Sequence, residues 1–127
     1  MSKTFTNDFV ALNIAVLTVS DTRTEETDTS GQLLVNRLTE AGHKLTAKQI
    51  VVDDKYKLRA AVSSWIADDI TQVVLVTGGT GFTARDTTPD ALEPLFDQTI
   101  TGFGELFRQI SFGQIGTSTI QSRATAG

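Results

Sequence analysis

The chain has 127 residues, with 11 basic and 15 acidic side chains and a formal net charge of −4. This length fits one domain with its own core, and the absence of cysteine excludes a disulfide framework, a thiolate metal site and a cysteine nucleophile. The acidic balance argues against a nucleic-acid binder, and the lack of a long apolar run argues against a signal peptide or a membrane span, so a soluble cytoplasmic protein is expected.

Three segments of the chain are expected to form strands. Residues 13–19 (NIAVLTV) are mostly apolar and rich in β-branched side chains, and residues 72–77 (QVVLVT) repeat this pattern. Runs of this kind are typical of strands that are buried on both faces of a parallel sheet. A further strand is expected at about residues 45–52, between two helical segments.

Two helices are expected between these strands. The first covers residues 31–41, where leucines recur at helical spacing, and one of residues 28–30 serves as its N-cap. The second covers residues 54–68 and is capped by Asp53 or Asp54. The apolar stripe of this second helix is formed by Leu58, Ala61, Val62, Trp65 and Ile66.

Two more helices are expected in the second half of the chain. Thr88 can serve as an N-cap, Pro89 suits the first helical turn, and Asp90 complements the helix dipole. A last helix is expected over residues 104–110. The side chains of this helix that are expected to face the core are Phe103, Leu106, Phe107 and Ile110.

The order of these elements, β-α-β-α-β-α-α, indicates an α/β fold in which helices pack on the faces of a parallel sheet. In such sheets, ligands bind beyond the carboxyl ends of the strands. Unusual polar segments follow all three strands, at residues 20–23, 53–54 and 78–86. We therefore expect a single site on one rim of the sheet.

A glycine-rich segment, TGGTG (Thr77–Gly81), follows the last expected strand. Glycine permits positive φ and close backbone approach, and successive N–H groups in such a loop can hold a phosphate oxygen. A tight turn without a ligand is the alternative. Arg85 could bind phosphate as a bidentate fork, or it could form a surface pair with Asp86. No Gly-Lys-Ser/Thr follows, which excludes a Walker A loop.

Carboxylates from two different segments are expected on the same rim. Asp53 comes after the second strand, and Asp86 comes after the glycine loop. Carboxylates that face phosphates need a cation between them, and Mg²⁺ binds one or two protein carboxylates together with substrate phosphates. Asp53 and Asp86 are therefore candidate Mg²⁺ ligands, while helix capping is the alternative role for Asp53.

Several blocks of the sequence resemble one known family. TVSDTR, TGGTGFTARDTTPDA, GFGELFRQIS and the following QSR are similar to the MoaB/MogA family of molybdenum cofactor biosynthesis, from about Ile14 to the last residue. The resemblance implies a three-layer α/β/α sandwich with a mostly parallel sheet, assembled as a trimer or hexamer. It also implies that residues 1–127 form a single molybdopterin-binding domain, which lacks the C-terminal strand and helix with which family chains continue.

The resemblance also implies a function in molybdenum cofactor biosynthesis. Active members transfer AMP from ATP to molybdopterin and release pyrophosphate with the help of Mg²⁺, so a Mg²⁺-dependent molybdopterin adenylyltransferase is expected. The alternative is a non-catalytic molybdopterin-binding or assembly protein that meets other proteins of the same pathway. Neither a nucleic acid nor a membrane is expected as a partner.

Most of the functional residues of the family fall on the expected rim. Asp53 and Asp86 match the pair of aspartates that is essential in active members, and they are expected to be catalytic and to bind the metal. The residues expected to bind molybdopterin or phosphate are Ser20, Asp21, Thr77, Gly78, Gly79, Thr80, Gly81, Arg85, Ser122 and Arg123.

Overall fold

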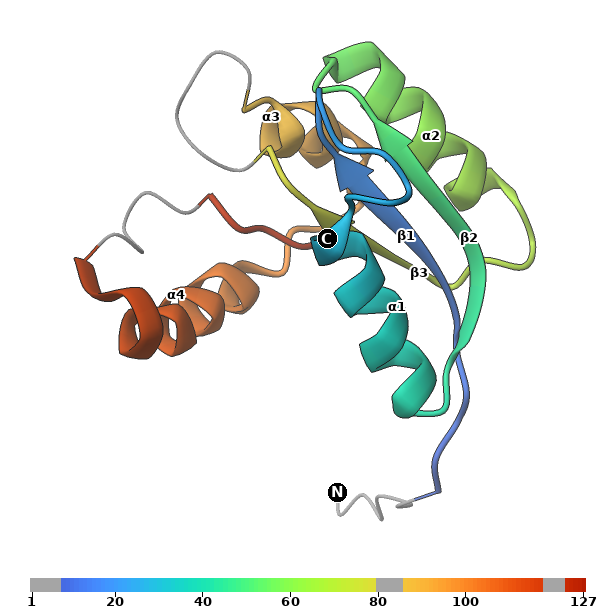
Figure 1. Ribbon diagram of the computed structural model, residues 1–127, viewed down its shortest axis with the longest axis horizontal. Helices are drawn as coiled ribbons and strands as arrows, with labels where there is room; N and C mark the ends of the chain where they lie inside the picture. The colour runs from blue at the N-terminus through green and yellow to red at the C-terminus, as the bar shows by residue number, and fades with distance from the viewer. Residues whose placement is uncertain (1–7, 80–85, 118–122) are drawn as a thin grey trace.

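Figure 1 shows the computed structural model of the chain, a parallel three-stranded sheet with helices on both faces. The residues that the structure describes are 8–79, 86–117 and 123–127. The first strand in the sequence lies between the other two in the sheet. The strands are β1 (Asn13–Val19), β2 (Lys44–Val51) and β3 (Val73–Thr77).

The register of the strands aligns their carboxyl ends. Val19 of β1 pairs with Val51 of β2, and Thr18 of β1 pairs with Thr77 of β3. All three strands therefore end at the same edge of the sheet. The expected α/β fold, its parallel sheet and its three strands are confirmed, with bounds that differ from the expected ones by at most one residue.

Helices form a layer on each side of this sheet. In Figure 1, the helix after β1 covers one face, while the helix after β2 and the short helix after β3 cover the other. The elements are α1 (Thr29–Glu40), α2 (Lys55–Ala67), α3 (Thr88–Leu92), a 3-10 turn η1 (Glu93–Leu95) and α4 (Thr101–Ile115). None of the helices in the described part of the chain has both the length and the apolar character that crossing a membrane requires.

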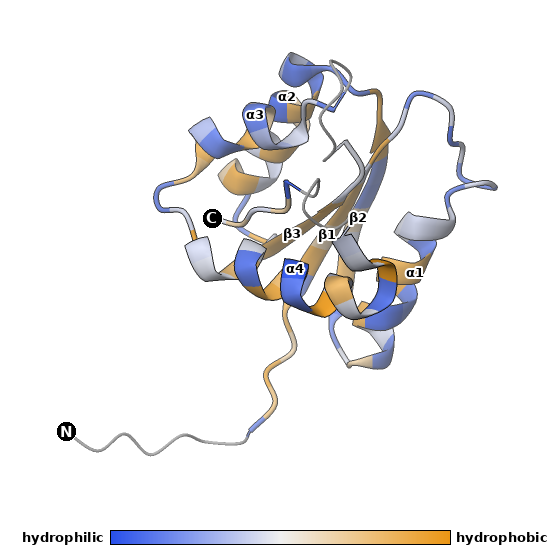
Figure 2. Ribbon diagram, turned by 90° about the vertical axis from the view of Figure 1, so that its left-hand side faces the viewer, coloured by the Kyte–Doolittle hydropathy of each residue, from blue (hydrophilic) through white to orange (hydrophobic). Residues whose placement is uncertain are grey.

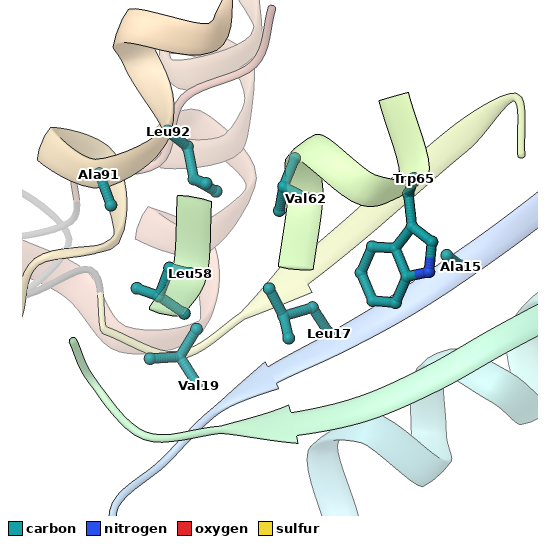
Figure 3. Close-up of a cluster of buried hydrophobic side chains, with 8 residues drawn as sticks. All are labelled: Ala15, Leu17, Val19, Leu58, Val62, Trp65, Ala91 and Leu92. Carbon is teal, nitrogen blue, oxygen red and sulfur yellow. The ribbon is translucent and has the colours of Figure 1, made fainter. Parts of the chain in front are cut away.

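β1 is buried along most of its length, and its side chains alternate between the two faces of the sheet. On one face, Ile14 and Val16 pack against Leu38 of α1. The other face carries a larger cluster under α2 and α3, shown in Figure 3. The buried members of this cluster are Ala15, Leu17, Val19, Leu58, Val62, Trp65, Ala91 and Leu92. Burial of apolar area on both sides of one strand thus holds the three layers together.

Aspartates cap α1 and α2. The carboxylate of Asp28 accepts a hydrogen bond from the backbone N–H of Gly31 at 3.0 Å. The carboxylate of Asp54 accepts hydrogen bonds from the backbone N–H groups of Tyr56 and Lys57, at 3.0 and 2.9 Å. Each bond satisfies an N–H group that has no partner inside its helix. Of the cap candidates in the sequence, Asp28 and Asp54 are therefore the correct ones.

The N-cap expected for α3 is wrong by one residue. Thr88 is the first residue of the helix, and Thr87 occupies the N-cap position. The helix starts directly against the glycine loop, so the Thr88 hydroxyl donates a hydrogen bond to the carbonyl oxygen of Gly78, at 2.8 Å, instead of capping the helix. Pro89 lies in the first turn, as expected.

The orientation expected for α4 is also wrong. Phe103, Leu106, Phe107 and Ile110 lie on one side of the helix, but their exposed fractions range from 43% to 60%. In Figure 1, α4 stands away from the sheet, and Figure 2 shows hydrophobic residues along this helix. Helical spacing sorts side chains into faces, but it does not say which element covers a face. Here α1, α2 and α3 already cover the sheet.

A buried polar cluster joins β1, β2 and the start of α1. Oδ2 of Asp28 accepts a hydrogen bond from the Thr18 hydroxyl at 2.8 Å and lies 3.2 Å from Nζ of Lys48. Lys48 also pairs with the exposed Glu25, at 3.2 Å. The side chain of Asp28 is 1% exposed and that of Lys48 is 12% exposed, so each charge depends on the other for a partner inside the protein.

The ion pair shifts the pKa of both partners. Burial alone would raise the pKa of the Asp28 carboxyl, but hydrogen bonds from Gly31, Thr18 and Lys48 outweigh it and hold the pKa below its ordinary value of 3.8. Burial alone would lower the pKa of Lys48, but Glu25 and Asp28 raise it above its ordinary value of 10.5. The stability that Asp28 contributes is therefore fully present above pH 3.8 and is lost as the pH falls through the lower pKa of the folded state.

The substitution Asp28→Asn tests this cluster. We expect it to lower the free energy of unfolding at neutral pH by about 3 kcal/mol, because asparagine can still cap α1 but leaves the buried Lys48 with only the exposed Glu25 as a carboxylate partner. The difference from the wild type should shrink as the pH falls below 3.8. Urea denaturation followed by circular dichroism measures both effects. Glu25→Gln, which removes only the exposed partner, should cost less than about 1 kcal/mol, and an equal loss in both variants would contradict the role of Asp28.

Gly31 leaves the space that this cluster occupies. A Cβ atom at Gly31 would overlap Oδ2 of Asp28 and would lie 2.5 Å from Oγ1 of Thr18. Both of these atoms are buried and held by the hydrogen bond between them, so neither can move away easily.

Gly31→Ala is therefore expected to destabilise the protein by about 1–3 kcal/mol, although alanine favours the helix by about 1 kcal/mol. Gly113→Ala in α4 is the matched control, because a Cβ atom at Gly113 would meet nothing within 4 Å. The control should be neutral or slightly stabilising. Thermal unfolding by calorimetry compares the two, and a stabilising Gly31→Ala would show that the cluster tolerates a methyl group.

Candidate functional site

Loops from neighbouring strands are tied together at the carboxyl edge of the sheet. The loop after β1 is linked to the loop after β2 through Asp21, whose Oδ1 accepts a hydrogen bond from the backbone N–H of Asp53 at 3.1 Å. The loop after β2 is linked to the start of α3 through Asp53 and Thr87. The polar segments that the sequence places after the strands therefore lie side by side wherever the structure describes them.

Asp53 is buried at the centre of this arrangement, with 7% of its surface exposed. Its Oδ1 accepts two hydrogen bonds from Thr87, one from the backbone N–H at 3.1 Å and one from the hydroxyl. Its Oδ2 borders the glycine loop, since a Cβ atom built at Gly79 would lie 3.1 Å from it. One carboxylate oxygen is thus held by the protein, while the other lies beside a backbone without a side chain.

The first two glycines of the loop adopt positive φ, +99° at Gly78 and +68° at Gly79. A side chain would also lack space there, because a Cβ atom would overlap the carbonyl oxygen of Val19 at the first glycine and Oγ1 of Thr88 at the second. Thr88 fixes the loop, since its N–H donates to the carbonyl oxygen of Gly79 at 3.0 Å. The expected positive φ and close backbone approach are confirmed at these two positions.

A cavity of about 190 Å³ lies between the ends of β1 and β3 and the start of α1. Three of the predicted ligand-binding residues, Ser20, Thr77 and Gly78, contribute to its lining. Arg23, from the polar segment expected on this rim, lines the same cavity, and so does Asp28, which was predicted only as a helix cap. Its candidacy as an N-cap could have placed Asp28 at the site, because the N-cap of a helix that follows β1 lies at the carboxyl edge of the sheet.

Ser20 and Arg23 shape the loop that borders this cavity. The hydroxyl oxygen of Ser20 accepts hydrogen bonds from the backbone N–H groups of Thr22 and Arg23, at 3.2 and 3.0 Å. The guanidinium of Arg23 donates to the carbonyl oxygen of Thr27. The chain therefore turns back toward α1, as expected for the polar, turn-favouring residues that follow β1.

Arg123 lies near the start of α3. Its guanidinium forms an ion pair with Asp90, at 2.7 Å, and donates to the carbonyl oxygen of Asp86 at 3.5 Å. It lines a second cavity of about 440 Å³, together with Glu93 and Arg108. The structure thus brings Arg123 close to Asp86, but it does not place Arg123 in the cavity that contains Gly78.

Metal binding by Asp53 and Asp86 remains a prediction. Asp86 directly precedes Thr87, so both aspartates belong to the same edge of the sheet. Within residues 8–79, 86–117 and 123–127, no group of three or more His, Asp or Glu side chains is arranged to hold a metal ion. The predicted ligand-binding residues that lie outside the described residues are Thr80, Gly81, Arg85 and Ser122.

Comparisons with known proteins identify relatives of this chain. A family model described as "Probable molybdopterin binding domain" matches residues 15–127. The chain is 57% identical over 120 residues to molybdenum cofactor biosynthesis protein B of Escherichia coli K12, which covers 94% of this chain and 71% of that protein.

Solved structures share the fold. A crystal structure of molybdenum cofactor biosynthesis protein B matches with a TM-score of 0.88 and 50% identity, covering 91% of this chain and 73% of that one. The tungsten cofactor synthesizing protein MoaB from Pyrococcus furiosus matches with a TM-score of 0.81 and 38% identity, covering 92% of this chain and 72% of that one. On the family model, the sequence identity and the shared fold together, the chain belongs to the MoaB/MogA family of molybdenum cofactor biosynthesis proteins.

Proposed function

We propose that this chain is a molybdopterin adenylyltransferase, which moves the AMP of ATP to molybdopterin and releases pyrophosphate. Family membership supports a role in molybdenum cofactor biosynthesis and supports molybdopterin as a ligand. The observation that carries the proposal is the buried carboxylate of Asp53, whose Oδ2 borders a glycine loop with positive φ. This pair lies at the carboxyl edge of the sheet, where parallel α/β proteins bind their ligands.

The proposed reaction is an in-line displacement at phosphorus. A terminal phosphate oxygen of molybdopterin attacks the α-phosphorus of ATP, the bond from this phosphorus to the bridging oxygen breaks, and pyrophosphate leaves. The bare backbone of Gly78 and Gly79 lets phosphate oxygens approach closely. Arg85 and Arg123 are proposed to hold phosphate groups by their guanidinium groups. Most of the acceleration would come from alignment and electrostatic stabilisation, because no covalent intermediate with the protein is involved.

Mg²⁺ fits the donors at this edge. Asp53 and Asp86 offer carboxylate oxygens, which are hard ligands of the kind that Mg²⁺ binds, and ATP phosphates and water would complete its coordination. When bound there, Mg²⁺ would neutralise the charge that develops on the departing pyrophosphate.

The alternative proposal is a non-catalytic protein that binds molybdopterin and meets other proteins of the pathway. It is supported by the hydrogen bonds from Thr87 to Asp53, because a purely structural link would also explain why this carboxylate is buried. Isothermal titration calorimetry separates the two proposals. Binding of molybdopterin without binding of Mg²⁺-ATP favours the non-catalytic alternative.

Asp53→Asn tests the catalytic proposal. We expect kcat for adenylyl transfer to fall by at least about 100-fold, because a neutral amide neither binds Mg²⁺ as strongly nor balances its charge. Turnover of radiolabelled ATP with molybdopterin and Mg²⁺ measures the effect. The control is Asp54→Asn at the next position, since asparagine also caps helices and the Asp54 carboxylate is bonded within α2. Wild-type turnover in Asp53→Asn, or equal losses in both variants, would refute the catalytic role.

We also propose that the chain assembles as a homo-oligomer, a trimer or a hexamer. Besides the family resemblance, the apolar side of α4 supports this proposal, because its four large side chains are exposed. Those side chains carry no charge, so two copies of this surface can pack together without burying an unpaired charge.

Light scattering coupled to size-exclusion chromatography tests the assembly. The expected mass is three or six times the 13.7 kDa of one chain. Leu106→Glu should shift the mass toward the monomer, because a carboxylate cannot be buried between apolar surfaces without a partner. Gln109→Glu places the same group on the same helix outside the apolar stripe and should leave the mass unchanged. A monomeric wild type would refute the proposal.

A further inference from the structure

The N-cap of α3 uses its hydroxyl in an unusual way. A threonine at an N-cap normally accepts a hydrogen bond from a backbone N–H of the first helical turn. Thr87 is the N-cap of α3, yet its side chain makes no such bond. Its hydroxyl donates to Oδ1 of Asp53 instead, and its backbone N–H donates to the same oxygen at 3.1 Å. The first turn of α3 therefore has no side-chain cap, and the Thr87 hydroxyl instead bonds a carboxylate from the loop after β2.

Two other segments of the chain hold Asp53 in place. Its backbone N–H is bonded to Asp21 in the loop after β1, and its Oδ1 is bonded to Thr87 before α3. Both contacts come from residues far away in the sequence. With the main chain and Oδ1 held, the position of Oδ2 beside Gly79 is set by the protein before any ligand arrives.

We propose that Thr87 is a positioning residue for Asp53, which holds Oδ1 so that Oδ2 faces the glycine loop where the phosphates of the nucleotide bind. This inference rests on the proposed adenylyl transfer for its effect on catalysis, but not for its effect on the Asp53 side chain. A carboxylate that is held in place can stabilise the charge that develops on the departing pyrophosphate, which is greatest in the transition state, so the loss of this orientation lowers the rate of the chemical step.

A purely structural role makes a different prediction from positioning. If Thr87 only stabilised the fold, its loss would lower thermal stability without changing the orientation of Asp53. The chain offers a threonine–aspartate contact far from the site, within the turn before β3, as a control for the loss of a hydroxyl. Thr71 donates its backbone N–H to Oδ1 of Asp68, at 2.6 Å, and its hydroxyl to Oδ2, at 3.0 Å.

Three variants of the full chain distinguish these roles. Thr87→Val removes the hydroxyl but keeps the size of the side chain and the backbone N–H, and Thr87→Ser restores the hydroxyl. Thr71→Val removes the corresponding hydroxyl beside Asp68. The first measurement is the set of three-bond couplings about χ1 of Asp53, recorded by NMR on the protein without ligands. The second is steady-state adenylyl transfer with varied ATP at saturating molybdopterin and Mg²⁺.

In Thr87→Val, the couplings of Asp53 should move from values typical of one rotamer toward values averaged over several rotamers. In the same variant, kcat should fall about tenfold, while the KM for ATP should change by less than about twofold. Thr87→Ser should return both measurements to near the wild type. Thr71→Val should alter neither, whatever it does to thermal stability.

The two possible failures can be told apart. Unchanged Asp53 couplings in Thr87→Val would overturn the positioning role, and so would an equal loss of kcat in Thr87→Ser. If the wild type shows no adenylyl transfer but Thr87→Val releases the Asp53 side chain, the proposed function fails and the control of Asp53 by Thr87 is supported.

Discussion

The structure depends on one constraint, the burial of β1 on both faces. A strand in this position must be apolar or must supply a partner for every polar side chain that it carries. Thr18 is the polar residue that β1 buries near its carboxyl end, and its hydroxyl is satisfied by Asp28. The Asp28 carboxylate in turn requires Lys48 from β2, and the cluster requires a glycine at position 31. A single buried hydroxyl is therefore connected, through Asp28, to the start of α1 and to a charge on a neighbouring strand.

The same edge of the sheet carries the candidate site, and its parts hold one another in place. Asp21 holds the main chain of Asp53, Thr87 holds its carboxylate, and Thr88 holds the glycine loop at Gly79. The first two contacts join different loops, and the third closes the loop between β3 and α3. The site thus lies at the strand ends and is cross-linked by polar side chains, which suits the proposed adenylyl transfer, a reaction that would rely on alignment more than on covalent chemistry.

The strands and the first two helices could be predicted because their sequence patterns depend on interactions between residues that are close together in the chain. The apolar run at residues 13–19 reports a strand buried on both faces, and the aspartates before α1 and α2 report helix starts. Contacts between loops left no such pattern. Nothing near Thr87 in the sequence indicates that its hydroxyl reaches Asp53, and nothing in the spacing of the α4 side chains says that no part of the sheet covers them. The sequence placed Asp53, Gly78 and Gly79 on one rim, but the bonds that orient them could be found only in three dimensions.

The strand order β2-β1-β3 also affects how the chain folds. β1, α1 and β2 are consecutive, and together they already contain the pair between Asp28 and Lys48. β3 is made later and pairs with the opposite edge of β1, joining Ile14 to Val73. Contacts between segments far apart in the sequence form slowly, because closing a long loop costs entropy. Until residues 73–77 pair with it, β1 has one open edge, and an apolar strand with an open edge is a site at which chains can aggregate.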